Sequence, residues 1–183
     1  NTLACDINNR GQIAGFTTDA DGSQHLFIWD DVNGMTDMGL CRLVHNSKML
    51  KINNKGQVVG SRKNPGEYSE AFICDIKNGF KLLGTLGGTH SMAFGINDKG
   101  RVVGRSRTVQ GEVHAFIWDD ANGMTDLGTI GGSYSSALCI NNRDQILGGS
   151  NKPGSDPSAV FPVIWDQKKE IHEFDMIPKV SWV

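Results

Sequence analysis

The sequence lacks long apolar runs, helical periodicity and an excess of charge of either sign. Its 183 residues include 18 lysines and arginines against 20 aspartates and glutamates, a net charge of −2. Proteins that bind nucleic acid through its phosphates carry a basic patch, so the near-equal numbers of basic and acidic residues argue against a nucleic-acid partner. No apolar run approaches the ~18 residues that a bilayer-spanning helix needs, so we expect no transmembrane segment.

Proline and cysteine are also scarce, with 5 and 4 residues. The cysteines at positions 5, 41, 74 and 139 include no Cys-x-x-Cys pair, so neither a structural zinc site nor a thioredoxin-type motif is indicated, and their disulfide state stays open. The chain also has no Gly-x-Ser-x-Gly elbow, phosphate-binding loop or His-Glu-x-x-His motif. We therefore predict no catalytic residue, cofactor or metal site, and the sequence favours a non-catalytic role.

Glycine, in contrast, is abundant at 23 of 183 residues, and much of it marks a repeat. The dipeptide Ile-Asn begins at residues 7, 52, 96 and 140, at intervals of 45, 44 and 44 residues. Three copies continue as Asn-x-x-Gly into a β-branched run, which predicts a hairpin turn with glycine at positive φ, as at Gly56 and Gly100. In the fourth copy Asp144 replaces the glycine, and aspartate tolerates the same conformation.

Two further markers follow each turn in register. An aromatic strand covers residues 25–29, 70–74, 114–118 and, less regularly, 162–165, and Asn-Gly follows at 33–34, 78–79 and 122–123. Because Asn-Gly is a strong hairpin signal, each copy predicts four antiparallel strands and an all-β protein. We place the whole chain, 1–183, in one repeat domain with copies at approximately 1–45, 46–89, 90–133 and 134–178 and a tail at 179–183.

The second and third strands of each copy are apolar on both faces, which is typical of sheets covered on both sides. A four-stranded antiparallel unit recurring every ~44 residues matches a β-propeller blade. Four copies fit either a closed four-bladed propeller or part of a larger ring, and the alternative is a linear stacked β-repeat array. In the Trp-Asp pairs at 29, 118 and 165 we expect tryptophan to fill the core and aspartate to open a turn; Cys74 replaces one tryptophan and should be buried.

The triplet His114-Ala115-Phe116, with residues 96–104 before it and 126–132 after it, resembles the HAF family of bacterial repeat proteins. The resemblance implies an exported protein that is extracellular or at the cell surface, although this chain itself shows no leader peptide. It brings no catalytic residue with it.

The copies differ most in the loops between second and third strands and in the connections between copies, where repeat scaffolds place function. His90 and Tyr134 hold equivalent places in two connections, and both can stack on a sugar or peptide and form a hydrogen bond. With Arg42 and His45 they make up our candidate ligand-binding rim. The alternative is that His90 and Tyr134 only cover the inner strand of their own copy.

Three functions remain open from the sequence. The first is a binding or interaction module for a glycan, peptide or protein ligand. The second is a glycan-directed, propeller-type hydrolase with acids in its channel, and the third is a structural cell-surface spacer. For the histidines, including the equivalent His25 and His114, we expect structural roles, in which a half-buried ring satisfies a backbone carbonyl. The sequence does not indicate an oligomeric state.

Overall fold

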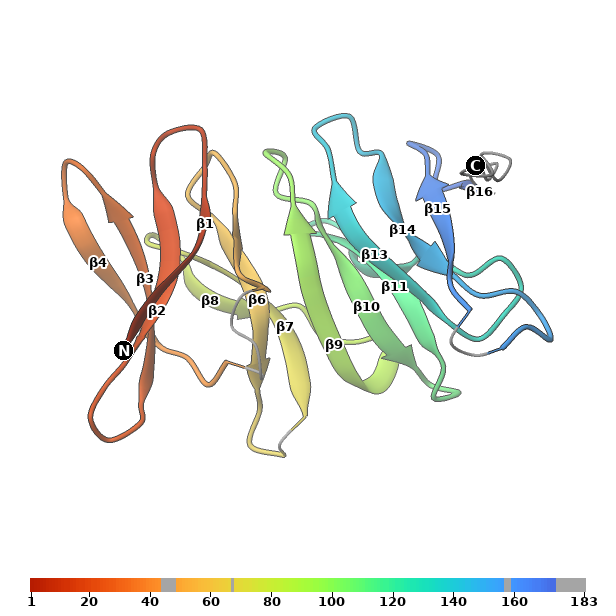
Figure 1. Cartoon of the computed structure of the whole chain (residues 1–183), viewed down its shortest axis with the longest axis horizontal. Coiled ribbons are helices and arrows are strands. Elements are labelled where there is room, and N and C mark those ends of the chain that lie inside the picture. The colour runs from red at the N-terminus through yellow and green to blue at the C-terminus, as the bar shows by residue number, and fades with distance from the viewer. Residues whose placement is uncertain (44–48, 67, 157–158, 174–183) are drawn as a thin grey trace, which may run out of the picture.

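The described residues form four sheets of four antiparallel strands, and within each sheet every strand pairs with the next one along the chain (Figure 1). The computed structural model describes residues 1–43, 49–66, 68–156 and 159–173. The first sheet contains β1 (Thr2–Ile7), β2 (Ile13–Thr18), β3 (Gln24–Asp30) and β4 (Gly34–Leu40), and the second contains β5 (Lys51–Ile52), β6 (Val58–Lys63), β7 (Ser69–Asp75) and β8 (Gly79–Leu82). The third contains β9 (Gly87–Ile96), β10 (Val102–Thr108), β11 (Val113–Asp119) and β12 (Gly123–Asp126), and the fourth contains β13 (Ser135–Ile140), β14 (Ile146–Ser150), β15 (Phe161–Trp165) and β16 (Ile171–Glu173). The all-β prediction with four four-stranded units is confirmed.

The turn after the first strand of each sheet forms as its asparagine and glycine predict. In the second sheet the Asn53 side-chain oxygen accepts hydrogen bonds from the backbone N–H groups of Lys55 and Gln57, both at 3.0 Å. Gly56 has a φ of +75° and Gly100 a φ of +83°, and Asp144 takes a φ of +64° in the fourth copy. The left-handed conformation predicted at these positions is confirmed.

The aspartate of each Trp-Asp pair opens the hairpin between the third and fourth strands, also as predicted. The Asp30 carboxylate accepts a hydrogen bond of 2.7 Å from the Asn33 backbone, and Gly34 follows at a φ of +67°. Asp75 and Asp119 repeat the arrangement in the second and third sheets. Because the short carboxylate and amide side chains cap the turn through local hydrogen bonds, neighbouring residues specify this hairpin.

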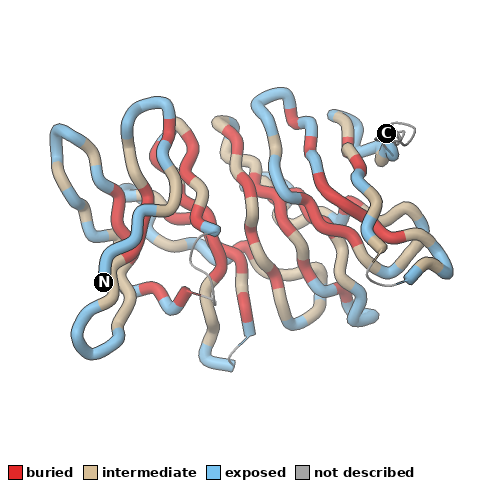
Figure 2. Tube along the Cα trace, viewed as in Figure 1, coloured by how far each residue is buried: buried red, intermediate tan, exposed pale blue. Residues whose placement is uncertain are grey.

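The sheets stack face to face, and a layer of apolar side chains fills each of the three interfaces. Ala14 and Ile28 of the first sheet meet Val58 and Cys74 of the second, and the same positions recur at the next two interfaces. Buried residues accordingly concentrate along the middle strands in Figure 2. The burial of Cys74 confirms its predicted place in the core.

An asparagine ladder joins the sheets at their turns. The side-chain amide of Asn8 donates to the backbone carbonyl of Asn53 at 2.8 Å, Asn53 donates to Asn97 at 2.9 Å, and Asn97 donates to Asn141 at 3.1 Å. Each asparagine therefore caps its own turn with its oxygen and holds the next sheet with its nitrogen. The sequence predicted only the first of these two roles.

The four sheets form an open row. Strands β1, β5, β9 and β13 contact one another along the inner edge, and the first and fourth sheets lie at opposite ends of the molecule (Figure 1). The closed four-bladed ring is therefore not formed by the described residues. The prediction that tryptophan fills the core holds for Trp118 and Trp165 but is wrong for Trp29, which is 37% exposed because its face of the first sheet has no neighbour in the described chain.

Candidate functional site

The variable loops and the connections between sheets gather at one end of the molecule, which we call the loop end (Figure 1). Short bridges join them there: Leu43 pairs with Arg62, Leu86 with Thr108, and Val113 with Tyr134. Each connection thus lies against a loop between second and third strands. The two classes of variable segment that the sequence singled out form one surface.

A groove of about 770 Å³ opens at the loop end between the first and second sheets, and we call it the basic groove. The first connection builds it by crossing from one sheet to the other. The Cys41 N–H donates to the Gln24 carbonyl at 2.7 Å, and the Lys63 N–H donates to the Arg42 carbonyl at 2.6 Å. The lining residues are Asp21, Gly22, Ser23, Gln24, Leu40, Cys41, Arg42, Leu43, Arg62, Lys63 and Pro65.

Positive charge dominates the described lining of the basic groove. Arg42, Arg62 and Lys63 supply three cations, whereas Asp21 supplies the single carboxylate. Hydrogen bonds from Ser23 lower the pKa of Asp21, so this carboxylate stays ionised at neutral pH. Burial raises the pKa of the Cys41 thiol to about 12, so it stays protonated at neutral pH, which does not suit it to nucleophilic chemistry. The groove is therefore suited to holding an anionic ligand.

Of the three predicted rim residues that the structure describes, Arg42 lines this groove and His90 and Tyr134 do not. His90 is half-buried; its ring packs edge-on against Tyr68 at 4.9 Å between centroids, and its Nδ1 lies 2.6 Å from the Thr89 hydroxyl. The Tyr134 hydroxyl accepts a hydrogen bond from Arg105 at 3.2 Å. Among the described residues no hydrogen bond or ring contact joins His90 to Tyr134, and His45 lies outside those residues.

Sequence reasoning missed Tyr68, Arg62 and Lys63 as individual contributors. All three lie in or beside the second-to-third-strand loop of the second copy, which the sequence marked as variable. Pro65 of that loop lines the basic groove, and Tyr68 contacts His90. The sequence pattern that could have predicted Arg62 and Lys63 is their adjacency at the start of a variable loop, with Arg42 in the preceding connection.

The repeated histidines bridge strands within their own sheets. His114 Nδ1 lies 2.8 Å from the Asp126 carboxylate, and His25 Nδ1 lies 2.9 Å from that of Asp37. The expected partner was a backbone carbonyl, and the observed partner is a carboxylate on the fourth strand, three residues after the strand begins. The structural role expected for these histidines thus fits, with a different acceptor.

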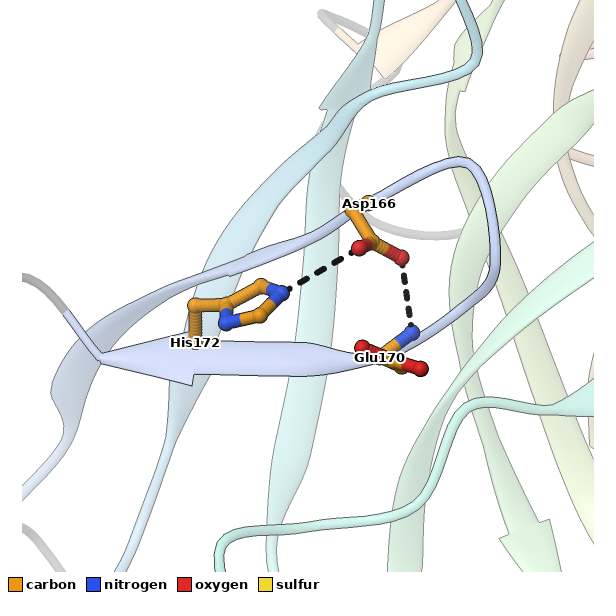
Figure 3. A group of neighbouring side chains, drawn as sticks. All are labelled: Asp166, Glu170 and His172. Atoms are coloured by element: carbon orange, nitrogen blue, oxygen red, sulfur yellow. Dashed lines mark hydrogen bonds and ion pairs between the residues drawn. The ribbon is translucent and has the colours of Figure 1, made fainter.

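One group of side chains has the composition of a metal site. Ligand atoms of Asp166, Glu170 and His172 all lie within 4.8 Å of one another (Figure 3). However, the Asp166 carboxylate already accepts hydrogen bonds from the Lys168 and Glu170 backbone at 2.9 Å. This is the turn-opening role of Asp30 in the first sheet, so the hairpin accounts for the arrangement.

A second hollow, of about 330 Å³, lies at the opposite end, where the four Ile-Asn turns surround it. Asp98 is the one carboxylate of its described lining, and hydrogen bonds from Asn54 lower its pKa. On the described inner strands the one carboxylate is Asp6, which accepts from the Ile52 N–H at 3.0 Å. Glycoside hydrolysis commonly needs two facing acids about 5–9.5 Å apart, and the described residues of each of these two locations supply one carboxylate.

Comparison with known proteins gives a likeness of fold. The structure resembles TolB from Acinetobacter baumannii. The match has a TM-score of 0.66 at 14% sequence identity and covers 94% of this chain. It covers 43% of the TolB chain, so the present chain corresponds to less than half of that protein. No protein-family model and no curated protein matches the sequence. No helix in the described part of the chain has the length and apolar character to cross a bilayer.

Proposed function

We propose that this chain is a segment of a β-propeller that acts as a non-catalytic binding module, with an acidic peptide segment of a partner protein as ligand of the basic groove. The stacked four-stranded sheets and the ~44-residue repeat support the propeller. The resemblance to HAF repeats supports an exported bacterial protein that works outside the cell or at its surface.

The observation that carries the binding proposal is the charge of the groove. Arg42 of the first connection and Arg62 and Lys63 at the end of β6 line one opening of about 770 Å³. Guanidinium groups bind carboxylates with two parallel hydrogen bonds, which favours an acidic ligand. The described lining includes no aromatic side chain on which a sugar ring would stack, so a peptide is a better fit than a neutral glycan.

The test is an array of acidic, neutral and basic peptides together with neutral and acidic glycans. We expect native protein to bind acidic peptides and to lose affinity as salt rises. The double variant Arg42→Gln/Arg62→Gln should weaken binding by about tenfold or more, on the scale of hydrogen bonds to charged groups. Arg143→Gln is the matched control, because Arg143 is exposed at the turn end of the fourth sheet, away from the groove.

Two outcomes would contradict this proposal. Equal binding by native protein and the double variant would exclude the groove as the site. Binding that is confined to glycans and lost in His90→Ala/Tyr134→Ala would instead place the ligand on the rim that the sequence alone suggested.

The hydrolase alternative finds less support, since the described inner strands carry a single carboxylate, Asp6. No observation specifically favours the spacer alternative.

A further inference from the structure

A β-bulge recurs on the inner strands of the sheets. Where the first strand of a sheet pairs with the second, the register skips Cys5 in β1, Phe94 in β9 and Leu138 in β13. A bulge leaves its extra residue outside the ladder and turns that side chain in a new direction. In the third and fourth sheets the extra residue is large and apolar, and Leu138 is 55% exposed. The inner strands of these two sheets therefore present apolar side chains outside the stacked interfaces.

The two apolar bulge residues form a hollow together with the segment that enters the second sheet. The hollow, which we call the inner hollow, has a volume of about 210 Å³ and is lined by Met49, Lys51, Phe94 and Leu138. Met49 is 44% exposed, and the Lys51 ammonium lies 3.6 Å from the Asp6 carboxylate, which neutralises it. The inner hollow is therefore mainly apolar, and its walls come from three successive sheets.

Arg105 of β10 lies beside the inner hollow without a carboxylate partner. Its guanidinium carbon is 5.6 Å from the centre of the Phe94 ring, and its Nη1 donates to the Tyr134 hydroxyl at 3.2 Å. Its Nη2 makes a weak contact of 3.6 Å with the Met92 sulfur. All three partners are neutral, and no ion pair to Arg105 occurs among the described residues. Because Arg105 is half-buried, its charge has lost part of its hydration without gaining a counter-ion.

The other cations of the third sheet differ from Arg105 in this respect. Lys99 and Arg101 both pair with Asp144 of the fourth sheet. Arg107, two residues after Arg105 on the same strand, is exposed to solvent and donates to a backbone carbonyl of the loop that follows, at 2.7 Å. Arg105 is therefore the cation of this sheet that an anionic ligand would stabilise most.

We propose that the inner hollow and Arg105 together bind a small carboxylate that carries an apolar chain, such as a medium-chain fatty acid. The chain packs in the hollow against Phe94 and Leu138, and the carboxylate accepts from the guanidinium N–H groups that Tyr134 and Met92 leave over. A hollow of about 210 Å³ holds roughly seven groups of the 30 Å³ that a water molecule occupies in the liquid, which matches the chain of octanoate. This site is separate from the basic groove, which lies between the first and second sheets, and does not depend on the function proposed for that groove.

Isothermal titration calorimetry with octanoate, below the concentration at which it forms micelles, tests the proposal. We expect the native chain to bind octanoate and to bind octanol, which has the same chain without the charge, about tenfold more weakly. Octylammonium carries the opposite charge and acetate lacks the chain, so neither should bind measurably at the same concentrations. The two comparisons separate the contribution of the charge from that of the apolar chain.

Two variants locate the site, and a third is the matched control. Arg105→Gln should weaken octanoate binding by about tenfold and leave octanol binding unchanged, because it removes only the charge. Leu138→Ser should weaken the binding of both ligands, and the exposure of Leu138 favours retention of the fold. Arg107→Gln removes a neighbouring arginine of the same strand and should bind octanoate like the native chain. Circular dichroism should show the same β-structure for all three variants.

Several results would overturn the proposal. No octanoate binding by the native chain, or equal binding of octanoate and octylammonium, would show that Arg105 does not select a carboxylate. Unchanged octanoate affinity in folded Arg105→Gln, or an equal loss in Arg107→Gln, would place the ligand elsewhere. If Arg105→Gln does not fold, Leu138→Ser and the comparison with octylammonium still decide. The variant Arg42→Gln/Arg62→Gln should bind octanoate normally, so a failure at the basic groove is distinguishable from a failure here.

Discussion

Replacing Asn53 with alanine tests the double role of the ladder asparagines. Asn53 is 4% exposed, and its side chain makes four hydrogen bonds. Two of them cap its own turn by accepting from the Lys55 and Gln57 backbone, a third joins Gln57, and the fourth, at 2.9 Å, reaches the Asn97 carbonyl in the next sheet. Each such bond contributes about 1 kcal/mol net, so we expect Asn53→Ala to lower the free energy of unfolding by about 3–4 kcal/mol.

Asn141→Ala is the comparison that separates the two roles. Asn141 caps its turn in the same way, with bonds to Arg143 and Gln145, but it has no bond to a following sheet in the described structure. Because its side chain is also exposed, its loss should be about 1–2 kcal/mol smaller than that of Asn53→Ala. Equilibrium unfolding in urea, followed by tryptophan fluorescence, measures both values.

A third variant distinguishes capping from coupling between sheets. Asn53→Asp keeps an oxygen that can accept from the Lys55 and Gln57 backbone, but it removes the donor to Asn97. We expect it to retain the turn and still lose stability, because a carboxylate then faces a buried carbonyl. Equal losses for Asn53→Ala and Asn141→Ala would refute the claim that the bond between sheets stabilises the protein.

Three further predictions concern backbone conformation, titration and thiol reactivity. Gly100→Val should lower the free energy of unfolding by about 1–3 kcal/mol and Gly100→Asn by much less, since asparagine tolerates positive φ; equal losses in urea unfolding would show that the turn assignment is wrong. Hydrogen bonds from Asn54 lower the pKa of Asp98 below 3.8, so its contribution to stability is present above that pH and is lost as the pH falls through the lowered value. Stability measured against pH should therefore fall less steeply below about pH 4 in Asp98→Asn than in native protein, and an unchanged slope would exclude this carboxylate. Finally, the exposed Cys139 should react with a thiol reagent in the native state, whereas the buried Cys41, with its pKa raised to about 12, should react only on unfolding; native-state labelling of Cys41 would contradict its burial.

The sequence predicted the local hairpins because each is specified by a few neighbouring residues. Asn8 or Asp30 with the glycine that follows encodes a turn through contacts within four residues, and these turns all form. The number of strands per copy follows from the same signals. Whether the row of sheets closes depends instead on how far each sheet rotates against the next, and no local motif encodes that angle.

Interactions between residues of different copies were harder to predict from the sequence, because they depend on which turns become neighbours in the fold. Arg101 stands where the other copies have glutamine, and Asp144 stands where they have glycine; by sequence these are two unrelated departures. In the structure Asp144 accepts from the Asn97 amide at 2.8 Å, replacing the missing glutamine, and it pairs with Arg101 at 3.2 Å. The two departures compensate each other across the interface between the third and fourth sheets.

For the candidate rim, too, the sequence did not reveal which residues of different copies become neighbours. Equivalence within the repeat puts His90 and Tyr134 in corresponding connections, but equivalent residues of neighbouring copies lie one sheet apart. His90 contacts Tyr68 and Thr89, and Tyr134 accepts a hydrogen bond from Arg105. The cations of the basic groove come instead from a connection and a loop, which occupy different positions in the repeat.

The asparagine ladder also determines how unfolding spreads through the molecule. Each rung joins only adjacent sheets, so the stability of a sheet depends on its own hairpins and on its immediate neighbours, as in a one-dimensional chain of coupled units. The second and third sheets are held from both sides, and the first and fourth from one side in the described structure. Amide hydrogens should therefore exchange with solvent from the ends of the row inward, and any contact that adds a neighbour at one end would slow exchange most in the sheet at that end.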